Sequence, residues 1–219
     1  MASAAKAYKG LGMEGGMARW YDRTTRRDLP EFERLAARIA AIVPASSRVL
    51  EVAPGPGFLS IALARRGLDV AAVDISKTFV EIARRNAAAA GVTAHFERGN
   101  AAALPHADAS VDFVVCRAAF KNFSEPVKAM AEMRRVLRPG GTALLIDLRR
   151  DVSIAALKTY IDGLGVGWLN RMFMTLVFRV SLIKRAYPLE DIRRMASEAG
   201  WVQLRIEANP IGFEAWLTK

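Results

Sequence analysis

The sequence predicts an α/β fold in which a mostly parallel sheet is covered by helices on both faces. From residue 47 to about residue 147, short apolar runs alternate with amphipathic helical segments, as expected where parallel strands are buried on both sides. Residues 49–60, VLEVAPGPGFLS, pass from a buried strand through a Gly/Pro turn into a helix. Two closely spaced strand-like runs near the C-terminus predict an antiparallel hairpin.

The first part of the chain precedes the predicted sheet. Residues 1–45 read as one or two helices, of which Glu31–Val43 has the clearer amphipathic period. The next region alternates strands and helices. Its strands are expected at Arg48–Val52, Asp69–Val73, Ala94–Arg98, Val111–Cys116 and Gly141–Asp147. Its helices are expected at Phe58–Arg66, Ser76–Ala90 and Glu125–Leu137.

Several residues are typical of helix ends. Ser76 and Ser124 are predicted N-caps, because their hydroxyls can accept hydrogen bonds from the first helical N–H groups. Gly67 and Gly91 are predicted to end the helices before them. Beyond Asp147, the pattern predicts helix over 152–186, a helix at Leu189–Ala199, and strands at Trp201–Glu207 and Gly212–Thr218.

Composition limits the classes of function. The 219 residues fit one domain with a substantial core. The one cysteine, Cys116, lies in an apolar run, which predicts a core residue and a reducing, cytoplasmic compartment. No apolar signal-peptide region is visible at the N-terminus. With one cysteine and two histidines, we expect no zinc site and no other metal.

The net charge of +10 suggests an anionic partner. Basic proteins often meet nucleic acid or anionic membrane surfaces. Here the arginines occur mostly in pairs spread along the predicted helices, without a long basic block or a recognisable nucleic-acid module. Solvated helix faces explain this charge more simply, so nucleic acid is not the favoured partner.

The turn that follows Glu51 predicts a ligand site. Strand ends that open into a helix N-terminus bind nucleotides in open α/β sheets. Gly55 and Gly57 let the backbone approach a ligand closely, because they carry no side chain. A loop built for pyrophosphate would not place a carboxylate beside the phosphates. Glu51 therefore indicates a cationic or hydroxyl-bearing ligand.

This turn occurs together with four further motifs. With all five, the chain resembles class I S-adenosylmethionine-dependent methyltransferases, most closely their menaquinone/ubiquinone-type small-molecule branch. The motifs are Val73–Ser76 (VDIS), Gly99–Pro105 (GNAAALP), Val111–Val115 (VDFVV) and Arg135–Gly141 (RVLRPGG). The resemblance covers about residues 17–218. It implies a Rossmann-like, seven-stranded sheet and S-adenosyl-L-methionine as the cofactor.

The resemblance assigns one group of residues to the methionine end of the cofactor. Gly55 and Gly57 would pass beneath it, and Glu51 would support the loop and the cofactor's ammonium group. Ala53 stands where the family's first glycine usually lies, a small change that should keep the turn. Arg117 follows the fourth strand, where backbone groups of this family approach the methionyl moiety.

A second group is implied for the adenosine end. Asp74 would accept hydrogen bonds from both ribose hydroxyls, and Ile75 would lie against the adenine face. Asn100, in place of a commoner aspartate, and Ala101 would border the adenine edge. Tyr21 lies where an N-terminal segment of this family often folds over the cofactor.

The rival for this loop is a nicotinamide dinucleotide site. That fingerprint, G-x-G-x-x-G, needs a third glycine, but Ser60 stands in its place. Asp74 alone does not distinguish a nicotinamide dinucleotide from S-adenosylmethionine, because both cofactors carry a ribose. The later motifs favour the methyltransferase.

The catalytic residues are not determined by the sequence. Methyl transfer from a sulfonium is an in-line displacement, and a base is needed only if the acceptor must lose a proton. Lys121, Asn122 and Asp147 follow the fourth and fifth strands and are candidates for contact with the acceptor. We expect His106 to be solvated in a polar loop and His95 to be structural.

Residues 163–187 are predicted to cover the acceptor. They read as a helix that is apolar almost all round, which favours a lipophilic or aromatic acceptor. Arg171, Arg179 and Asn170 argue against a membrane span. Arg179, Lys184 and Arg185 permit peripheral contact with an anionic membrane. An ordinary core or dimer helix is an equal alternative.

We therefore predict an S-adenosylmethionine-dependent methyltransferase that acts on a small molecule. An RNA or ribosomal-component methyltransferase and a non-catalytic S-adenosylmethionine-binding protein are the alternatives. The protein is expected to be a monomer or homodimer. The expected organisation of the single domain is an N-terminal helical cap (1–45), a cofactor-binding core (46–150), a helical acceptor cap (151–188), and a last helix with the hairpin (189–219).

Overall fold

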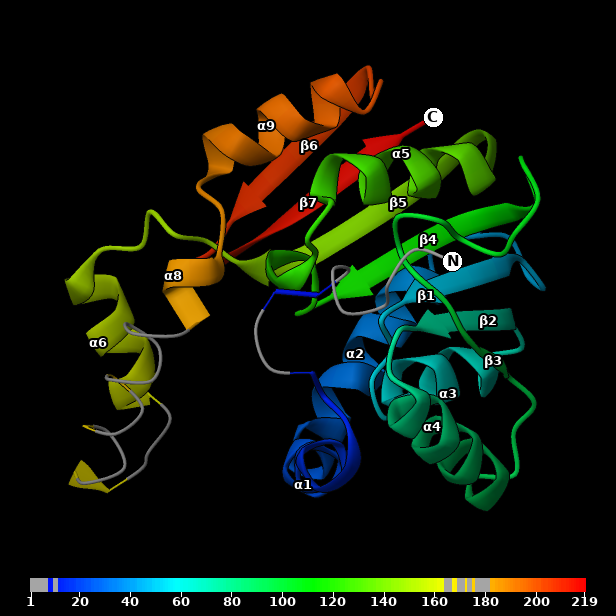
Figure 1. The fold of residues 1–219 in the computed structure, drawn as a ribbon, viewed down its shortest axis with the longest axis horizontal. Helices are drawn as coiled ribbons and strands as arrows, with labels where there is room; N and C mark the ends of the chain where they lie inside the picture. The colour runs from blue at the N-terminus through cyan, green and yellow to red at the C-terminus, as the bar shows by residue number, and fades with distance from the viewer. Residues whose placement is uncertain (1–7, 10–11, 164–166, 169–171, 173–174, 176–181) are drawn as a thin grey trace.

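A computed structural model describes residues 8–9, 12–163, 167–168, 172, 175 and 182–219. These residues form a seven-stranded sheet with the strand order β3-β2-β1-β4-β5-β7-β6. Neighbouring strands from β3 to β5 are parallel, whereas β7 runs antiparallel to both β5 and β6. The predicted α/β fold with its C-terminal antiparallel hairpin is therefore confirmed (Figure 1).

Apart from the helix predicted over 152–186, much of which lies outside the described residues, the predicted elements lie within a few residues of those in the structure. The strands are β1 Arg48–Val52, β2 Asp69–Asp74, β3 His95–Arg98, β4 Val111–Arg117, β5 Leu137–Leu148, β6 Gln203–Ala208 and β7 Gly212–Thr218. The α-helices are α1 Gly15–Thr25, α2 Leu29–Ala40, α3 Phe58–Ala64, α4 Lys77–Ala89, α5 Pro126–Val136, α6 Ile154–Gly163, α8 Ile183–Arg185 and α9 Leu189–Glu198. Two short 3-10 helices are η2 Arg26–Asp28 and η3 Phe120–Asn122.

One of the two N-cap predictions is confirmed and the other is wrong. The Ser76 hydroxyl accepts a hydrogen bond from the Phe79 N–H, 3.0 Å away, and so caps α4. Helix α5 starts one residue later than Ser124 requires, because Glu125 occupies the N-cap position and Pro126 begins the helix. The Ser124 hydroxyl is buried there and has no hydrogen-bond partner among the described residues.

Helices cover both faces of the sheet, as Figure 1 shows. On one face, α5 and α9 pack against β4, β5 and β7, with Met133 and Met195 among the contacts. On the other face, α2 and α3 pack against β1 and β4, with Ile39 and Leu63 among the contacts. Helix α4 covers the β2–β3 edge, where Ala83 meets Phe96. The apolar strands are therefore shielded from both sides, and the predicted core residue Cys116 is fully buried.

The parallel strands bring the loops at their carboxyl ends together. The carboxyl ends of β1, β2, β4 and β5 point to the same edge of the sheet (Figure 1). The Gly/Pro turn, the start of α4, the segment around η3 and the end of β5 all lie at this edge. The fold thereby assembles groups that are up to about a hundred residues apart in sequence.

Most of the predicted apolar cap helix lies outside the described residues. Of residues 163–187, those described include Trp168 and Met172, whose exposed fractions are 68% and 64%, and helix α8. None of the helices in the described parts of the chain combines the length and apolar character that crossing a membrane requires.

Candidate functional site

Glu51, at the tip of β1, is a buried carboxyl tied to the following helix. Its Oε2 accepts a hydrogen bond from the hydroxyl of Ser60, 2.5 Å away in the first turn of α3. Burial raises the pKa of Glu51 to about 7, against the opposing hydrogen bonds of Ser60 and the charge of Arg117. A cation placed beside Glu51 would favour its ionised form. The side chain is therefore suited to receive a positively charged group.

The turn after β1 depends on three left-handed residues. Ala53, Gly55 and Gly57 have φ angles of 59°, 55° and 81°. The structure thus keeps the turn with alanine in place of the usual first glycine, at a cost of about 1–2 kcal/mol for an L-residue in this conformation. Gly57 also has no room for a side chain, because a Cβ there would lie 2.9 Å from the Cβ of Ala83.

Asp74, at the end of β2, joins two loops. One carboxylate oxygen accepts the N–H of Gly55 at 3.0 Å, and the other accepts the N–H of Ser76 at 2.9 Å. Burial raises the pKa of Asp74 to about 6, although these N–H groups act in the opposite direction. Each carboxylate oxygen has two lone pairs, so both can also accept a hydroxyl hydrogen bond. The loop after β1 and the start of α4 are therefore held around one acid.

The predicted adenine-edge residues form a turn beside this carboxylate. The Asn100 side-chain oxygen accepts the N–H of Ala102 at 3.0 Å, and its backbone oxygen accepts the N–H of Ala103 at 2.9 Å. Ala101 is partly buried against the core. Ile75 is half-buried between Asp74 and the start of α4. The amide oxygen of Asn100 is thus already used within the turn, and one lone pair is left for a ligand.

The side chains of Tyr21 and Arg117 have different partners near the turn. Tyr21, on α1, packs edge-on against Phe79, and one of its ring carbons lies 3.9 Å from where a Cβ on Gly55 would be. Tyr21 therefore lies beside the turn, and its contact with the cofactor stays a prediction. Arg117, at the end of β4, is turned towards α2. Its guanidinium pairs with Glu31 at 3.0 Å and lies 4.5 Å from the centre of the Phe32 ring.

Two of the three candidate catalytic residues form a buried ion pair. The Lys121 ammonium lies 2.8 Å from Asp147 Oδ1 and also donates to the Ala118 carbonyl at 2.6 Å. The other Asp147 oxygen accepts the Lys121 backbone N–H at 2.9 Å. Both residues are only 6% exposed. The pair fixes the segment after β4 to the end of β5, while Asn122 accepts the Lys9 N–H through its backbone oxygen.

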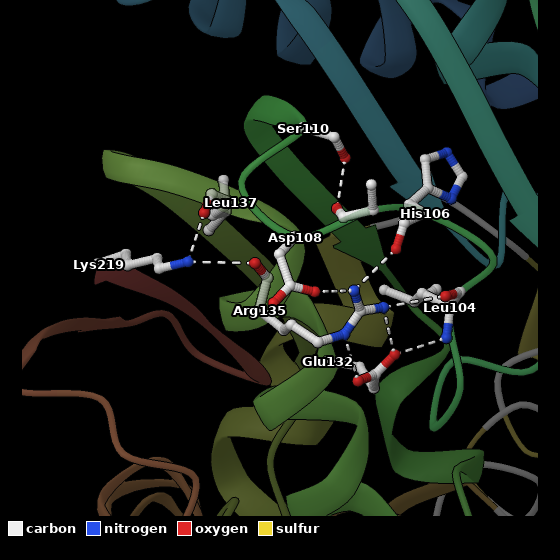
Figure 2. Close-up of polar contacts among 9 residues, drawn as sticks. Leu104, His106, Asp108, Ser110, Glu132, Arg135, Leu137 and Lys219 are labelled. Atoms are coloured by element: carbon white, nitrogen blue, oxygen red, sulfur yellow. Dashed lines mark hydrogen bonds and ion pairs between the residues drawn. The ribbon is translucent and has the colours of Figure 1, made fainter.

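Arg135 holds the loop that follows the adenine-edge turn, in an arrangement called here the Arg135 clamp, which the sequence did not predict. Figure 2 shows the Arg135 guanidinium on α5 paired with Glu132 at 2.7 Å and with Asp108 at 2.6 Å. It also donates to the carbonyls of Leu104 and His106, at 3.0 and 2.8 Å. Glu132 in turn accepts the Leu104 N–H at 2.8 Å. The spacing of Glu132 and Arg135, three apart on a helix, is the local signal for half of this clamp.

One sequence expectation in the same loop is wrong. His106 was expected to be solvated, but its side chain is only 13% exposed and its Nδ1 lies 3.7 Å from Glu97. Burial lowers the pKa of His106. His95, in β3, is exposed. Neither histidine belongs to the cluster around Asp74, and the described residues contain no group of side chains suited to a metal ion.

Comparisons with known proteins point to one family. A family model for a methyltransferase domain matches residues 50–145. A demethylmenaquinone methyltransferase of Deinococcus radiodurans is 38% identical over 116 residues, which are 52% of this chain and 48% of the relative. A ubiquinone biosynthesis O-methyltransferase of Xanthomonas axonopodis pv. citri is 28% identical over 171 residues, which are 78% of this chain and 66% of the relative.

The fold also has solved counterparts. A Methanococcus maripaludis protein, whose structure is described as a candidate S-adenosyl-L-methionine-dependent methyltransferase, superposes with a TM-score of 0.76 at 21% identity, over 96% of this chain and 95% of that protein. At this identity, the likeness concerns the fold. The chain spans about half the length of the first curated relatives that it matches, 47% to 50%.

We predict that Glu51→Gln stabilises the ligand-free protein at pH 8 by on the order of 3 kcal/mol. The pKa of Glu51 is about 7 in the folded protein, against an ordinary value of 4.5 that we assign to the unfolded chain. Between pH 4.5 and pH 7, folding is therefore accompanied by the uptake of a proton. The free energy of unfolding therefore falls as the pH rises through this window. Glutamine does not titrate, so the Glu51→Gln variant does not lose this stability. Urea unfolding from pH 4 to pH 8 measures the difference. A pH-independent difference, or an equal effect of the exposed Glu81→Gln, would contradict this prediction.

We predict that Arg135→Met destabilises the protein by about 1–3 kcal/mol, because the Leu104 and His106 carbonyls and two carboxylates lose their shared donor. The variant should also bind S-adenosylhomocysteine more weakly, since Leu104 follows directly on the adenine-edge turn. Urea unfolding and calorimetry provide the two measurements. The exposed Arg205→Met is the control, because Arg205 lies on the edge strand β6 and pairs there with Glu207 of the same strand. Equal effects of both variants would exclude a specific clamp.

Proposed function

The chain carries a class I S-adenosylmethionine-dependent methyltransferase domain, and from this premise we propose that it methylates a small, lipophilic or aromatic acceptor by in-line displacement. The family match confirms the predicted family and, with it, S-adenosyl-L-methionine as the cofactor, and the solved structure shares the fold. The proposal depends above all on one observation: the buried acids Glu51 and Asp74 flank a left-handed glycine turn at the carboxyl edge of the sheet.

The site residues fit this cofactor. Asp74 has lone pairs on both oxygens for two ribose hydroxyls, and the turn leaves the backbone of Gly55 and Gly57 uncovered by side chains of their own. Glu51, whose pKa is about 7, can ionise opposite an ammonium group. When bound, the cofactor supplies an already activated methyl group. The protein's part is to hold donor and acceptor in line and to exclude water.

We propose that the candidate residues Lys121, Asn122 and Asp147 shape the acceptor side without serving as a proton acceptor. A lysine ammonium paired with a carboxylate at 2.8 Å is a cation with no lone pair to offer. Asp147 is in turn occupied by Lys121 and by two backbone N–H groups. The ion pair therefore suits a positioning role, in which it fixes the segment after β4 against β5.

The names of the relatives and the exposed apolar residues support a lipophilic acceptor. Demethylmenaquinone and ubiquinone biosynthesis appear in the names of matched proteins. The exposed large apolar side chains include Met17 and Trp20 on α1, and Trp168 and Met172 beyond α6. An oxygen-bearing ring compound with apolar substituents fits both observations. Peripheral contact with an anionic membrane, through these side chains and the neighbouring basic residues, belongs to the same proposal.

The domain organisation follows from the same proposal. Residues 46–150 bind the cofactor, residues 1–45 and 151–188 cover the site, and residues 189–219 complete the sheet. We propose a monomer or homodimer as the working assembly.

We predict that Asp74→Ala weakens the binding of S-adenosylmethionine and S-adenosylhomocysteine by about 30- to 100-fold, because two hydrogen bonds to a charged acceptor are lost. Calorimetry measures this change. Asp69→Ala is the matched control, since Asp69 begins the same strand at its other end and is exposed. Tighter binding of a nicotinamide dinucleotide, or equal losses in the two variants, would refute the assigned cofactor site.

We predict that methyl transfer occurs to lipophilic phenols or quinols and not to RNA. An assay with labelled S-adenosylmethionine and a panel of phenols, quinols, thiols and RNA tests this expectation. Transfer to RNA alone would support the RNA methyltransferase instead. Tight cofactor binding without transfer to any member of the panel would favour the non-catalytic protein.

A further inference from the structure

The glycine turn, residues 53–57, depends on groups outside it for its shape. It contains two prolines, Pro54 and Pro56, which have no N–H to donate. Of the three N–H groups that remain, one donates within the turn, from Gly57 to the Pro54 carbonyl at 3.1 Å. The other two donate to groups at the end of β2. The first half of the turn is therefore fixed by β2, whereas the second half needs another partner.

Asn86, near the end of α4, supplies that partner. Its Nδ2 donates to the Pro56 carbonyl at 2.9 Å and to Asp22 Oδ1 on α1 at 2.9 Å. Its Oδ1 accepts a hydrogen bond from the Arg26 guanidinium, also at 2.9 Å. Three of the four hydrogen bonds that a side-chain amide can form are therefore made. One side chain thus joins the turn to the N-terminal helix.

Asp22 and Arg26 form the other side of this network. Arg26 pairs with Asp22 at 3.1 Å, and its guanidinium lies 5.4 Å from the centre of the Phe58 ring. Phe58 is the first residue of α3 and directly follows the turn. Tyr21, the residue before Asp22, lies beside Gly55. The network therefore contacts the chain just before and just after the last glycine of the turn.

The direction of the Pro56 carbonyl matters because a peptide unit is planar. It also sets the direction of the Gly57 N–H, which belongs to the same unit. Gly57 has a φ of 81°, and glycine tolerates a wide range of φ values. Without a partner for its carbonyl, this peptide unit can rotate. The hydrogen bond from Asn86 therefore selects one orientation of the backbone that faces the cofactor site.

From this network we propose that Asn86 is a positioning residue, which fixes the glycine turn for the methionine end of the cofactor. The inference rests on the proposed function and on the assignment of the turn to this end. Asn86 acts through the Pro56 carbonyl, while Asp22 and Arg26 hold its side chain. The adenosine end is assigned to Asp74 and the turn at Asn100, so its binding does not depend on this contact.

Two ligands separate the ends of the cofactor. S-adenosylhomocysteine carries the amino-acid part, whereas 5′-methylthioadenosine lacks it. We expect Asn86→Ala to weaken the binding of S-adenosylhomocysteine by about tenfold and that of 5′-methylthioadenosine by no more than about twofold, as measured by calorimetry. Arg85→Ala is the matched control, because Arg85 is an exposed neighbour on the same helix, and it should change neither affinity.

An exchange of side chains separates the position of the turn from the attachment of α1. Asn86→Asp keeps an acceptor for Arg26, but it removes the donor to Pro56 and places two carboxylates side by side. Combined with Asp22→Asn, it again pairs an amide with a carboxylate, yet the Pro56 carbonyl still lacks its donor. We expect the double variant to recover most of the urea midpoint lost in Asn86→Asp. Its affinity for S-adenosylhomocysteine should stay about tenfold below that of the unsubstituted protein.

Three results would overturn the positioning role. They are equal losses for the two ligands in Asn86→Ala, no loss for S-adenosylhomocysteine, and full recovery of its affinity in the double variant. If Asn86→Ala does not fold, the double variant decides alone. Binding of S-adenosylhomocysteine but not of 5′-methylthioadenosine to the unsubstituted protein would also overturn the role, since the adenosine end would then have no affinity of its own to retain.

The proposed function has a separate test in the same measurements. Failure of the unsubstituted protein to bind S-adenosylhomocysteine would overturn the proposed function itself. Calorimetry with that ligand therefore precedes the work on the variants. Once binding to the unsubstituted protein is established, each of the results above concerns Asn86 alone.

Discussion

The two hydrogen bonds that Asp74 accepts are the interaction on which the site depends. One comes from Gly55 in the turn after β1, and the other from Ser76 at the start of α4. Neither loop is regular secondary structure, so each would otherwise be free to separate from the other. A single buried carboxylate instead sets their spacing, and the parallel pairing of β1 with β2 sets the position of that carboxylate.

This arrangement favours ligand binding at the expense of the ligand-free fold. The pKa values of Glu51 and Asp74 are raised to about 7 and about 6, because burial disfavours their charged forms. A ligand with an ammonium group and hydroxyls would offset that desolvation. The positive φ of Ala53 adds local strain in the same turn. The least stable features of the edge are therefore those that the cofactor would contact.

Three sets of hydrogen bonds made by charged side chains, called ties below, hold the loops around the site. Arg135 fixes the segment behind the adenine-edge turn, Glu14 fixes the N-terminal segment to α4, and Lys121–Asp147 fixes the segment after β4. Each tie joins backbone groups to a side chain on another element, so that the loops keep their shape without packing as helices or strands. Lys121–Asp147 is buried, whereas the contacts of Arg135 and Glu14 are partly or largely exposed, so solvent screens those two more strongly.

The sequence by itself determined the strands, the helices and the glycine turn, because hydrophobic period and Gly/Pro chemistry are local properties. It also identified Glu51, Asp74 and Tyr21, whose proposed roles depend on their place beside known motifs. Only the tertiary structure paired Lys121 with Asp147 and Tyr8 with Phe123, and only it brought Arg135 to Leu104 and His106. Even Ser124 was misjudged by one position, since a cap depends on where the helix begins. Such contacts join residues distant in sequence. No local pattern encodes which of the many polar side chains will meet once the strands have paired and the helices have packed.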